Sequence, residues 1–312
     1  MLRHALSCPV CSETLDIDAN SLAKYKSVSC VNHHLFDFAK QGYLNLLLSQ
    51  HKKSKHPGDT QEMVQARTQF LNKGFYNGIA TFLITQCLPS IASRFDSESM
   101  ANNSIFSYCD LACGEGFYTE KIHKALEQTK PAEADDQPED KRSSGKVIST
   151  GLDISTPAIK AACQRSNSIQ WLIASLSRIP LQDQSQDLAT GLFFHFDLNE
   201  VARILKPNGH FIMVTTGPNH LIELRQHIYD VVKEEKIKDF SASTHQLSYI
   251  KTITWQESKH LNSPADIQSL LAMTPHYWRC TQDKKQQLAL LNELEVTLDI
   301  QFDIFSKPAH IT

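Results

Sequence analysis

The sequence contains no long hydrophobic run. None of its apolar stretches approaches the roughly 18 to 20 residues that a membrane-spanning helix needs. The segment Met1–Cys8 has no apolar core of the length found in secretory signals. We therefore expect a cytoplasmic protein without a membrane partner, and its 41% of hydrophobic residues is ordinary for a soluble globular fold.

A strong excess of either charge is also missing. The formal net charge is −3, which does not by itself indicate a nucleic-acid ligand. Phosphate contacts need only a local basic patch, however, and residues 51–56 read His-Lys-Lys-Ser-Lys-His. We predict that Lys52, Lys53 and Lys55 contact nucleic acid; the alternative is a solvated surface loop.

Three of the cysteines have the spacing of metal ligands. In a cytosolic protein, eight cysteines argue against a disulfide framework. Two residues separate Cys8 from Cys11, and eighteen more precede Cys30, which His33 and His34 soon follow. Two such pairs can enclose a tetrahedral ion, and either histidine can complete the set. Since three thiolates and an imidazole leave no open position, we expect a structural Zn²⁺.

Residues 105–217 alternate between strand and helix patterns, which predicts a parallel sheet covered by helices. The expected strands are 105–110, 147–153, 169–174, 188–194 and 210–216. The expected helices are 118–126, 157–164 and a segment that ends at residue 205. We therefore predict an α/β fold of the Rossmann-like class, preceded by the small zinc module.

Two further patterns flank this region. Residues 57–95 read as helical, with Asp59 or Thr60 as the N-cap and a break at Gly74. Near the end of the chain, residues 296–305 alternate apolar and polar side chains with a period of two. That alternation predicts an antiparallel strand at the edge of the sheet.

A glycine-containing loop connects the first expected strand to its helix. Glycines let the backbone approach a ligand closely, and here Gly114, Glu115 and Gly116 follow Asp110. Ala112 stands where a dinucleotide fingerprint has its first glycine, and no third glycine follows, so a pyrophosphate ligand is disfavoured. Asp110 can hold a ligand ammonium directly or through water. S-adenosylmethionine (SAM) carries such a group and fits the loop.

A second acid stands at the end of the next expected strand. Asp153 is expected to bind the ribose hydroxyls of the cofactor, as an acid does in dinucleotide folds; the alternative is a helix-capping role. It lies 37 residues after Gly116 rather than the usual ~20. An acidic insertion at 127–146, of disordered composition, accounts for the difference.

These patterns divide the chain into three parts. We predict a zinc-binding recognition module at 1–48, a helical connector at 49–104 and a class I SAM-dependent methyltransferase domain at 105–312. A zinc module beside a methyltransferase domain indicates a large substrate, and we expect a nucleic acid.

Motifs along nearly the whole chain carry a family resemblance. They are Cys8-Pro-Val-Cys11, Cys30 to Asp37, Ala39 to Leu46, Gln50 to Ser54, Pro57-Gly-Asp59, Met63 to Arg67, Gly74-Phe-Tyr76, the glycine loop, Leu205-Lys-Pro, Gly217-Pro-Asn-His220 and Met273-Thr-Pro275. In these motifs the chain resembles the zinc-containing RlmA-type methyltransferases. That family methylates N1 of a guanine in 23S ribosomal RNA.

The resemblance implies particular roles. The fourth zinc ligand of the family lies four residues after the third cysteine, which matches His34. The family residues that contact the cofactor match Tyr76 and His220. The zinc module and the methyltransferase domain would form an RNA cleft with the lysines of 52–55 on its recognition side. The expected target is a guanine in a hairpin loop of domain II, of the guanosine 745 class, and members commonly form homodimers.

The chain departs from the family pattern at the end of its fourth expected strand. The family reads an aromatic residue followed by Ala-Pro, whereas residues 193–196 here read Phe-Phe-His-Phe. A neutral imidazole at His195 is a candidate base for the N1 proton of guanine. Phe193, Phe194 and Phe196 are candidates for stacking on the base; otherwise they pack in the core.

Two other functions remain compatible with the sequence. One is a small-molecule methyltransferase, which shares the cofactor fold but needs neither a zinc module nor a basic stretch. The other is a non-catalytic RNA-binding protein that has kept the fold.

Overall fold

An eight-stranded mixed sheet forms the centre of the protein. The computed structural model describes residues 5–17, 27–51, 57–89, 91, 105–128, 146–233, 240 and 246–309. Lys52, Lys53, Lys55 and residues 129–145 of the acidic insertion lie outside the described residues.

The strand order in this sheet is β10-β11-β9-β8-β5-β6-β7-β4. The strands are β4 (Leu44–Asn45), β5 (Ile105–Leu111), β6 (Lys146–Asp153), β7 (Gln170–Ile173), β8 (Gln186–Leu192), β9 (Leu205–Thr216), β10 (Ser248–Leu261) and β11 (Leu294–Ser306). Strands β4 to β9 pair in parallel, which confirms the predicted α/β class. The carboxyl ends of β5, β6 and β8 therefore meet at one edge of the sheet.

The prediction of an edge strand at 296–305 was wrong. Strand β11 pairs with β9 on one side and with β10 on the other, so it lies inside the sheet. Its second half, Leu298–Phe305, is buried throughout. On this side of the sheet β10 is the edge strand, and its alternation of half-buried and exposed residues fits a strand with one solvated face.

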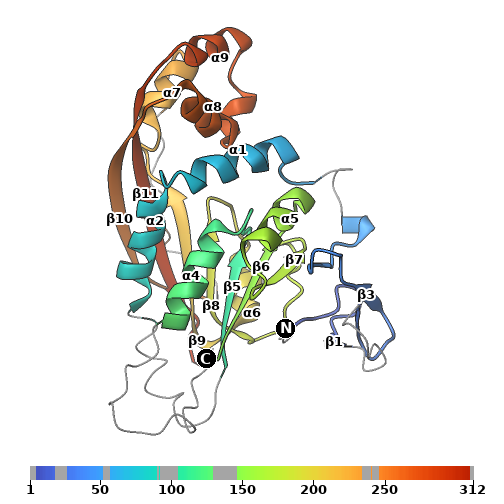
Figure 1. The fold of residues 1–312 in the computed structure, drawn as a ribbon. Coiled ribbons are helices and arrows are strands. Elements are labelled where there is room, and N and C mark those ends of the chain that lie inside the picture. Colours follow the sequence, from blue (N-terminus) through green and yellow to red (C-terminus); the bar gives the residue numbers. More distant parts are fainter. Residues whose placement is uncertain are drawn as a thin grey trace, which may run out of the picture.

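Helices cover both faces of the sheet and its carboxyl edge. They are α1 (Gln61–Asn72), α2 (Asn77–Phe82), the π-helical η2 (Leu83–Cys87), α4 (Phe117–Gln128), α5 (Thr156–Arg165), α6 (Leu198–Ile204), α7 (Ile222–Ile228), α8 (Pro264–Ala272), η4 (Pro275–Trp278) and α9 (Gln282–Ala289). Helices α4 and α5 contact β6 on one face, and α6 contacts β9. Helix α1 lies over the carboxyl ends of the central strands, beneath α8 (Figure 1).

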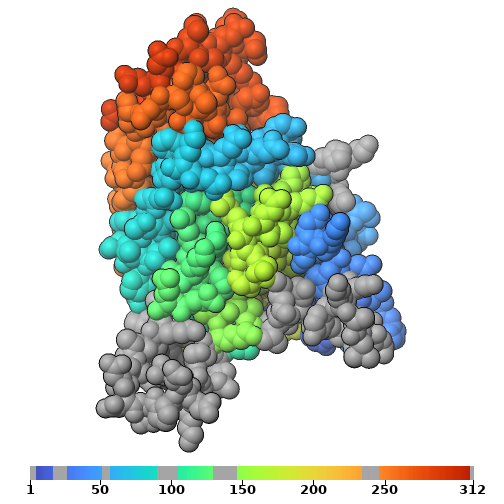
Figure 2. Space-filling model, viewed as in Figure 1, coloured from blue at the N-terminus to red at the C-terminus, as the bar shows by residue number. Residues whose placement is uncertain are grey.

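The ends of α1 follow from its sequence. Thr60 is the N-cap, and its hydroxyl accepts a hydrogen bond from the Met63 amide. Gly74 ends the helix with a φ of +83°, a conformation that suits glycine. Figure 2 shows α1 wedged between the C-terminal segment and the α4–α5 surface. The helix is thus placed to cover any ligand bound at this edge.

A small antiparallel sheet near the N-terminus is fused to the large one. Its strands are β1 (Asp16–Ile17), β2 (Ser27–Ser29) and β3 (Leu35–Asp37), and the 3₁₀ turn η1 (Ser49–His51) follows β4. The Ser7 amide donates to the Pro180 carbonyl at 3.1 Å, and Leu6 pairs with Leu181. Leu6 and Val28 lie in the same apolar cluster as Leu181 and the α6 residues. Strand β4 lies before the predicted boundary at residue 48 but belongs to the large sheet. The predicted domain boundaries at residues 48 and 104 stay predictions.

Within the described part of the chain, every helix is too short or too polar to cross a membrane.

Candidate functional site: a zinc centre and a cofactor pocket

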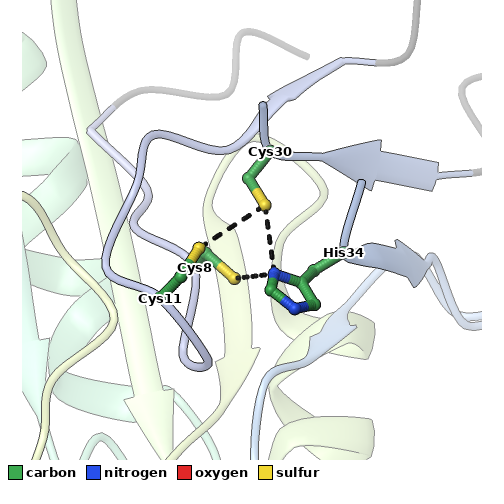
Figure 3. A group of neighbouring side chains, drawn as sticks. All are labelled: Cys8, Cys11, Cys30 and His34. Carbon is green, nitrogen blue, oxygen red and sulfur yellow. Dashed lines mark hydrogen bonds between the residues drawn. The ribbon is translucent and has the colours of Figure 1, made fainter. Parts of the chain in front are cut away.

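Four side chains of the small sheet converge on one point. Figure 3 shows Cys8, Cys11, Cys30 and His34, whose ligand atoms all lie within 4.8 Å of one another. The His34 Nδ1 atom is 3.3 Å from Cys30 Sγ and 3.7 Å from Cys8 Sγ, and Cys11 Sγ is 3.6 Å from Cys30 Sγ. Zn–S bonds of ~2.3 Å in tetrahedral geometry place ligand atoms about 3.5 to 3.8 Å apart. The donor set therefore fits a structural Zn²⁺.

Two turns bring the ligands together. The Ser12 amide donates to the Cys8 carbonyl, and the His33 amide donates to the Cys30 carbonyl. Ser12 and His33 both have a positive φ, 68° and 62°, which closes each turn tightly. His33 is exposed and occupies the turn, whereas His34 points to the three cysteines and is the histidine placed to act as a ligand, as the resemblance implies.

The thiols of this cluster differ in their proton affinity. Burial raises the pKa of Cys8 to about 11. A hydrogen bond from Asn32 is the main cause that lowers the pKa of Cys11 to about 6. A bound Zn²⁺ deprotonates the thiols that ligate it.

The glycine loop and the loop after β6 are joined by a carboxylate. Asp153 accepts hydrogen bonds from the Gly114 amide at 3.0 Å and the Ser155 amide at 2.8 Å. Burial raises the pKa of Asp153, and these two amides act against that rise. Its carboxylate thus stands at the carboxyl edge of the sheet, where the ribose role was predicted.

Gly116 is required for packing as well as for its φ of +83°. A Cβ atom there would lie 2.7 Å from the Trp171 ring. Trp171 also fills the space over Gly151, which has no room for a side chain. The Trp171 side chain of β7 therefore packs directly against the glycine loop and leaves room only for glycine at position 116.

Asp110 is buried beneath the loop. Its two oxygens accept hydrogen bonds from the hydroxyls of Thr119 and Thr190, at 2.5 Å and 2.9 Å. Burial raises its pKa to about 7, although both hydroxyls act in the opposite direction. The predicted contact with the cofactor ammonium stays a prediction.

Glu115 points away from the loop. Its carboxylate forms a bidentate ion pair with Arg165, at 2.5 Å and 3.0 Å, and only 1% of the residue is exposed. Arg165 also donates to Asn72 on α1. The side chain of Glu115 thus joins α5 to the loop, and its predicted cofactor contact can come only from the backbone.

Tyr76 and His220 belong to a group of aromatic rings that reaches Tyr118, just after the glycine loop, through Phe193. Their ring centroids are 6.3 Å apart, and Tyr76 is buried. The hydroxyls of Tyr76 and Tyr118 are buried and find no hydrogen-bond partner among the described residues. Buried hydroxyls normally bond to a partner. Two such groups beside the glycine loop fit a polar ligand such as SAM.

His220 is held as a neutral ring. Burial is the main cause that lowers its pKa to about 3. Its Nδ1 atom accepts a hydrogen bond from the Asp299 amide at 3.3 Å, so Nε2 carries the proton. The ring can donate a hydrogen bond but does not serve as a base at neutral pH.

Asp299 was not identified from the sequence. Its carboxylate accepts from the Asn219 amide at 2.9 Å, and its carbonyl accepts from the Gly217 amide at 2.8 Å. A Cβ atom at Gly217 would lie 2.4 Å from that carboxylate. A glycine at position 217 could have indicated a close contact with another part of the chain. The residue in contact with it, Asp299, lies on β11, about eighty residues later in the sequence.

The four residues after β8 separate into different environments. Phe193 is 40% exposed, has a φ of +59°, and lies 6.4 Å from the His220 ring. Phe194 and His195 are exposed. Phe196 instead packs on Phe211, with ring centroids 5.6 Å apart. A strained backbone at Phe193 is typical of a functional site.

Comparison with known proteins identifies both parts of the chain. Residues 6–55 match the zinc-ribbon family model described as "RlmA, N-terminal", and residues 109–213 match the "Methyltransferase domain" model. The chain is 26% identical over 305 residues to "Putative 23S rRNA (guanine-N(1)-)-methyltransferase YxjB" of Bacillus subtilis, covering 96% of each. It is 27% identical over 309 residues to "23S rRNA (guanine(748)-N(1))-methyltransferase" of Streptomyces fradiae, covering 96% of this chain and 95% of that protein.

The protein is a class I SAM-dependent methyltransferase with a structural zinc site. More particularly, it combines an RlmA-type zinc ribbon with a methyltransferase domain, and it is similar end to end to relatives named as 23S rRNA (guanine-N1)-methyltransferases. The family resemblance, the fold and both cofactors are thereby confirmed.

Replacing Cys11 with Ser should remove the zinc. Cys11 supplies one of four ligands, and the small sheet has little apolar core of its own, so the melting temperature should also fall. Metal analysis and thermal denaturation test this. Cys163→Ser, at a partly exposed free cysteine on α5, is the matched control and should keep its zinc. Full zinc occupancy in Cys11→Ser would contradict the site.

Replacing Asp110 with Asn should change how stability depends on pH. The folded protein keeps the Asp110 proton up to about pH 7, whereas the unfolded chain loses it near 3.8. This carboxyl therefore costs stability as the pH rises through that interval. We expect the melting temperature of Asp110→Asn, relative to the native protein, to rise across it. A difference independent of pH would show that Asp110 is not the titrating group.

Proposed function

We propose that this protein transfers the methyl group of SAM to N1 of a guanine in 23S ribosomal RNA, in a domain II hairpin loop of the guanosine 745 class. The main support is that this chain, which carries the ribbon and the methyltransferase domain, is similar end to end to relatives named for methylation of guanine N1 in 23S ribosomal RNA. The relative named for guanine 748 is as similar to this chain as the Bacillus subtilis relative is. Sequence similarity therefore does not select guanosine 745 over guanosine 748, and the choice of 745 is part of the proposal.

The path of the chain supports an RNA substrate. The segment 57–60 leads from the ribbon to α1 and touches the cofactor side of the sheet, because the Ser155 hydroxyl donates to the Asp59 carbonyl at 2.8 Å. The basic stretch that contains Lys55 comes directly before this segment in the sequence. Positive charge suited to phosphate therefore precedes, along the chain, a segment that contacts the cofactor side of the sheet.

The side chains around the pocket have distinct roles in this proposal. Bound SAM supplies a methyl group on a positively charged sulfur. Asp153 would hold the ribose, and Tyr76 and His220 would close the pocket around the ligand. Phe193, exposed at the end of β8, would stack on the unstacked guanine. His195 would accept the N1 proton, and burial of the site would align the reactants and exclude water.

The proposal includes the cellular setting. A ribosomal RNA substrate places the protein in the cytoplasm, and pairing into a homodimer remains part of the prediction. A small-molecule substrate and a non-catalytic RNA-binding role are the other outcomes of the following test.

A reverse-transcription scan of 23S RNA tests the proposal. A methyl group on guanine N1 blocks base pairing and stops the polymerase at one nucleotide. We expect a stop in the domain II hairpin that disappears when the gene is deleted and returns when it is restored. Restoration with Asp153→Ala, which removes the ribose acceptor, should leave the stop absent. Identical stops with and without the protein would refute this function.

Replacing His195 with Gln tests the proposed base. If the imidazole removes the N1 proton, the single-turnover rate should fall by about 10² or more. Asn199→Ala, at an exposed position on α6 four residues later, is a matched control, and its effect should be much smaller. An unchanged rate in His195→Gln would assign proton removal to another group or to water.

A further inference from the structure

Besides Arg165, a second cationic side chain lies over the glycine loop. Arg67, on α1, places its Nη1 atom 3.6 Å from where a Cβ of Gly114 would be. The same nitrogen pairs with Asp59 at 2.5 Å, and Nη2 donates to the Met273 carbonyl at 3.4 Å. About 24% of the Arg67 side chain is exposed, so a ligand in the loop can reach it.

The charge of Arg67 acts on the groups of the cofactor pocket. Burial is the main cause that raises the pKa of Asp153, and the Arg67 charge opposes it. The same charge opposes the rise in the pKa of Tyr118. Arg67 is thus close to both the ribose acceptor and one of the unpartnered hydroxyls.

Arg165, the other arginine at this loop, already has hydrogen-bond partners for its guanidinium. Its Nε and Nη2 atoms bind the carboxylate of Glu115, and Nη2 also binds Asn72. Arg67 is less fully occupied, because its contact with Met273 is long and its ion pair with Asp59 is partly exposed. A guanidinium has five N–H donors, which leaves Arg67 the capacity to bind a further carboxylate.

SAM carries one carboxylate, on its amino-acid end. With the ribose at Asp153 and the sulfur directed to the substrate, the amino-acid end would lie along the glycine loop. A carboxylate in a partly buried site needs a cationic or amide partner. We propose that Arg67 binds the methionine carboxylate of SAM, and that Asp59 and the Met273 carbonyl hold its guanidinium over Gly114.

This assignment explains why α1 crosses the carboxyl edge of the sheet. The helix is fixed at its far end by the ion pair between Lys73 and Asp266 on α8. At its middle it carries Arg67, whose two partners come from the segment before α1 and from the C-terminal end of α8. The guanidinium is thereby held in position before the cofactor arrives, and preorganisation of this kind favours binding.

A purely structural role for Arg67 predicts a different result. If the residue only ties the segment 57–60 to α8, its loss would loosen the pocket for every ligand. If it binds the carboxylate, its loss would affect only ligands that have one. Two compounds that differ in this group alone, SAM and decarboxylated SAM, separate the two roles.

The experiment measures binding of both compounds by calorimetry, without RNA, to the full-length zinc-loaded protein. For Arg67→Met we expect SAM affinity to fall by about 10- to 100-fold, the range of a charge-assisted bidentate pair, and decarboxylated SAM to bind nearly as before. Arg67→Lys keeps the charge but not the planar fork, so its SAM affinity should be intermediate.

Lys73→Met is the matched control, since it removes an ion pair that joins the end of α1 to α8 and leaves the Arg67 contacts in place. It should bind both compounds as the native protein does. An equal loss for both compounds in Arg67→Met would make Arg67 a structural clamp, and an unchanged SAM affinity would also overturn the assignment. Because no RNA is present, this result does not depend on the identity of the methyl acceptor.

Discussion

The carboxylate of Asp153 connects the parts from which the cofactor pocket is built. It joins the loop after β5 to the loop after β6 through two backbone amides. Ser155, in the second loop, then binds the segment that leads from the ribbon to α1. This carboxylate is largely desolvated, so it depends on those amides to remain charged. Pocket, linker and covering helix therefore rely on one half-buried acid.

The ribbon is part of the same body as the catalytic sheet. Its apolar residues, with Leu6 and Val28 among them, share a cluster with Leu172 of β7 and Val201 of α6. A module of this size could not bury enough surface by itself. Zinc and the flank of the sheet stabilise it together, which fixes the ribbon relative to the pocket. A fixed spacing between a recognition module and a reacting centre suits a large, folded substrate.

Much of this was predictable from local patterns. Buried apolar runs marked β5, β6 and β8, and ligand spacing marked the zinc centre. The contacts of Glu115 with Arg165 and of Asp110 with Thr190 were not predictable, because they join residues 50 and 80 positions apart. Strand β10 was missed although β-branched and aromatic residues fill its middle, since its polar, half-exposed face resembles a loop. Because β10 was not predicted, β11 was predicted to be the edge strand.

The most direct measurement of the central claim is the chemical identity of the product. The zinc-loaded protein would be incubated with methyl-labelled SAM and a transcript of the domain II hairpin, and the RNA digested to nucleosides for mass spectrometry. The account predicts label in 1-methylguanosine alone. Label in any other nucleoside, or none in RNA from a protein that binds SAM, would contradict it.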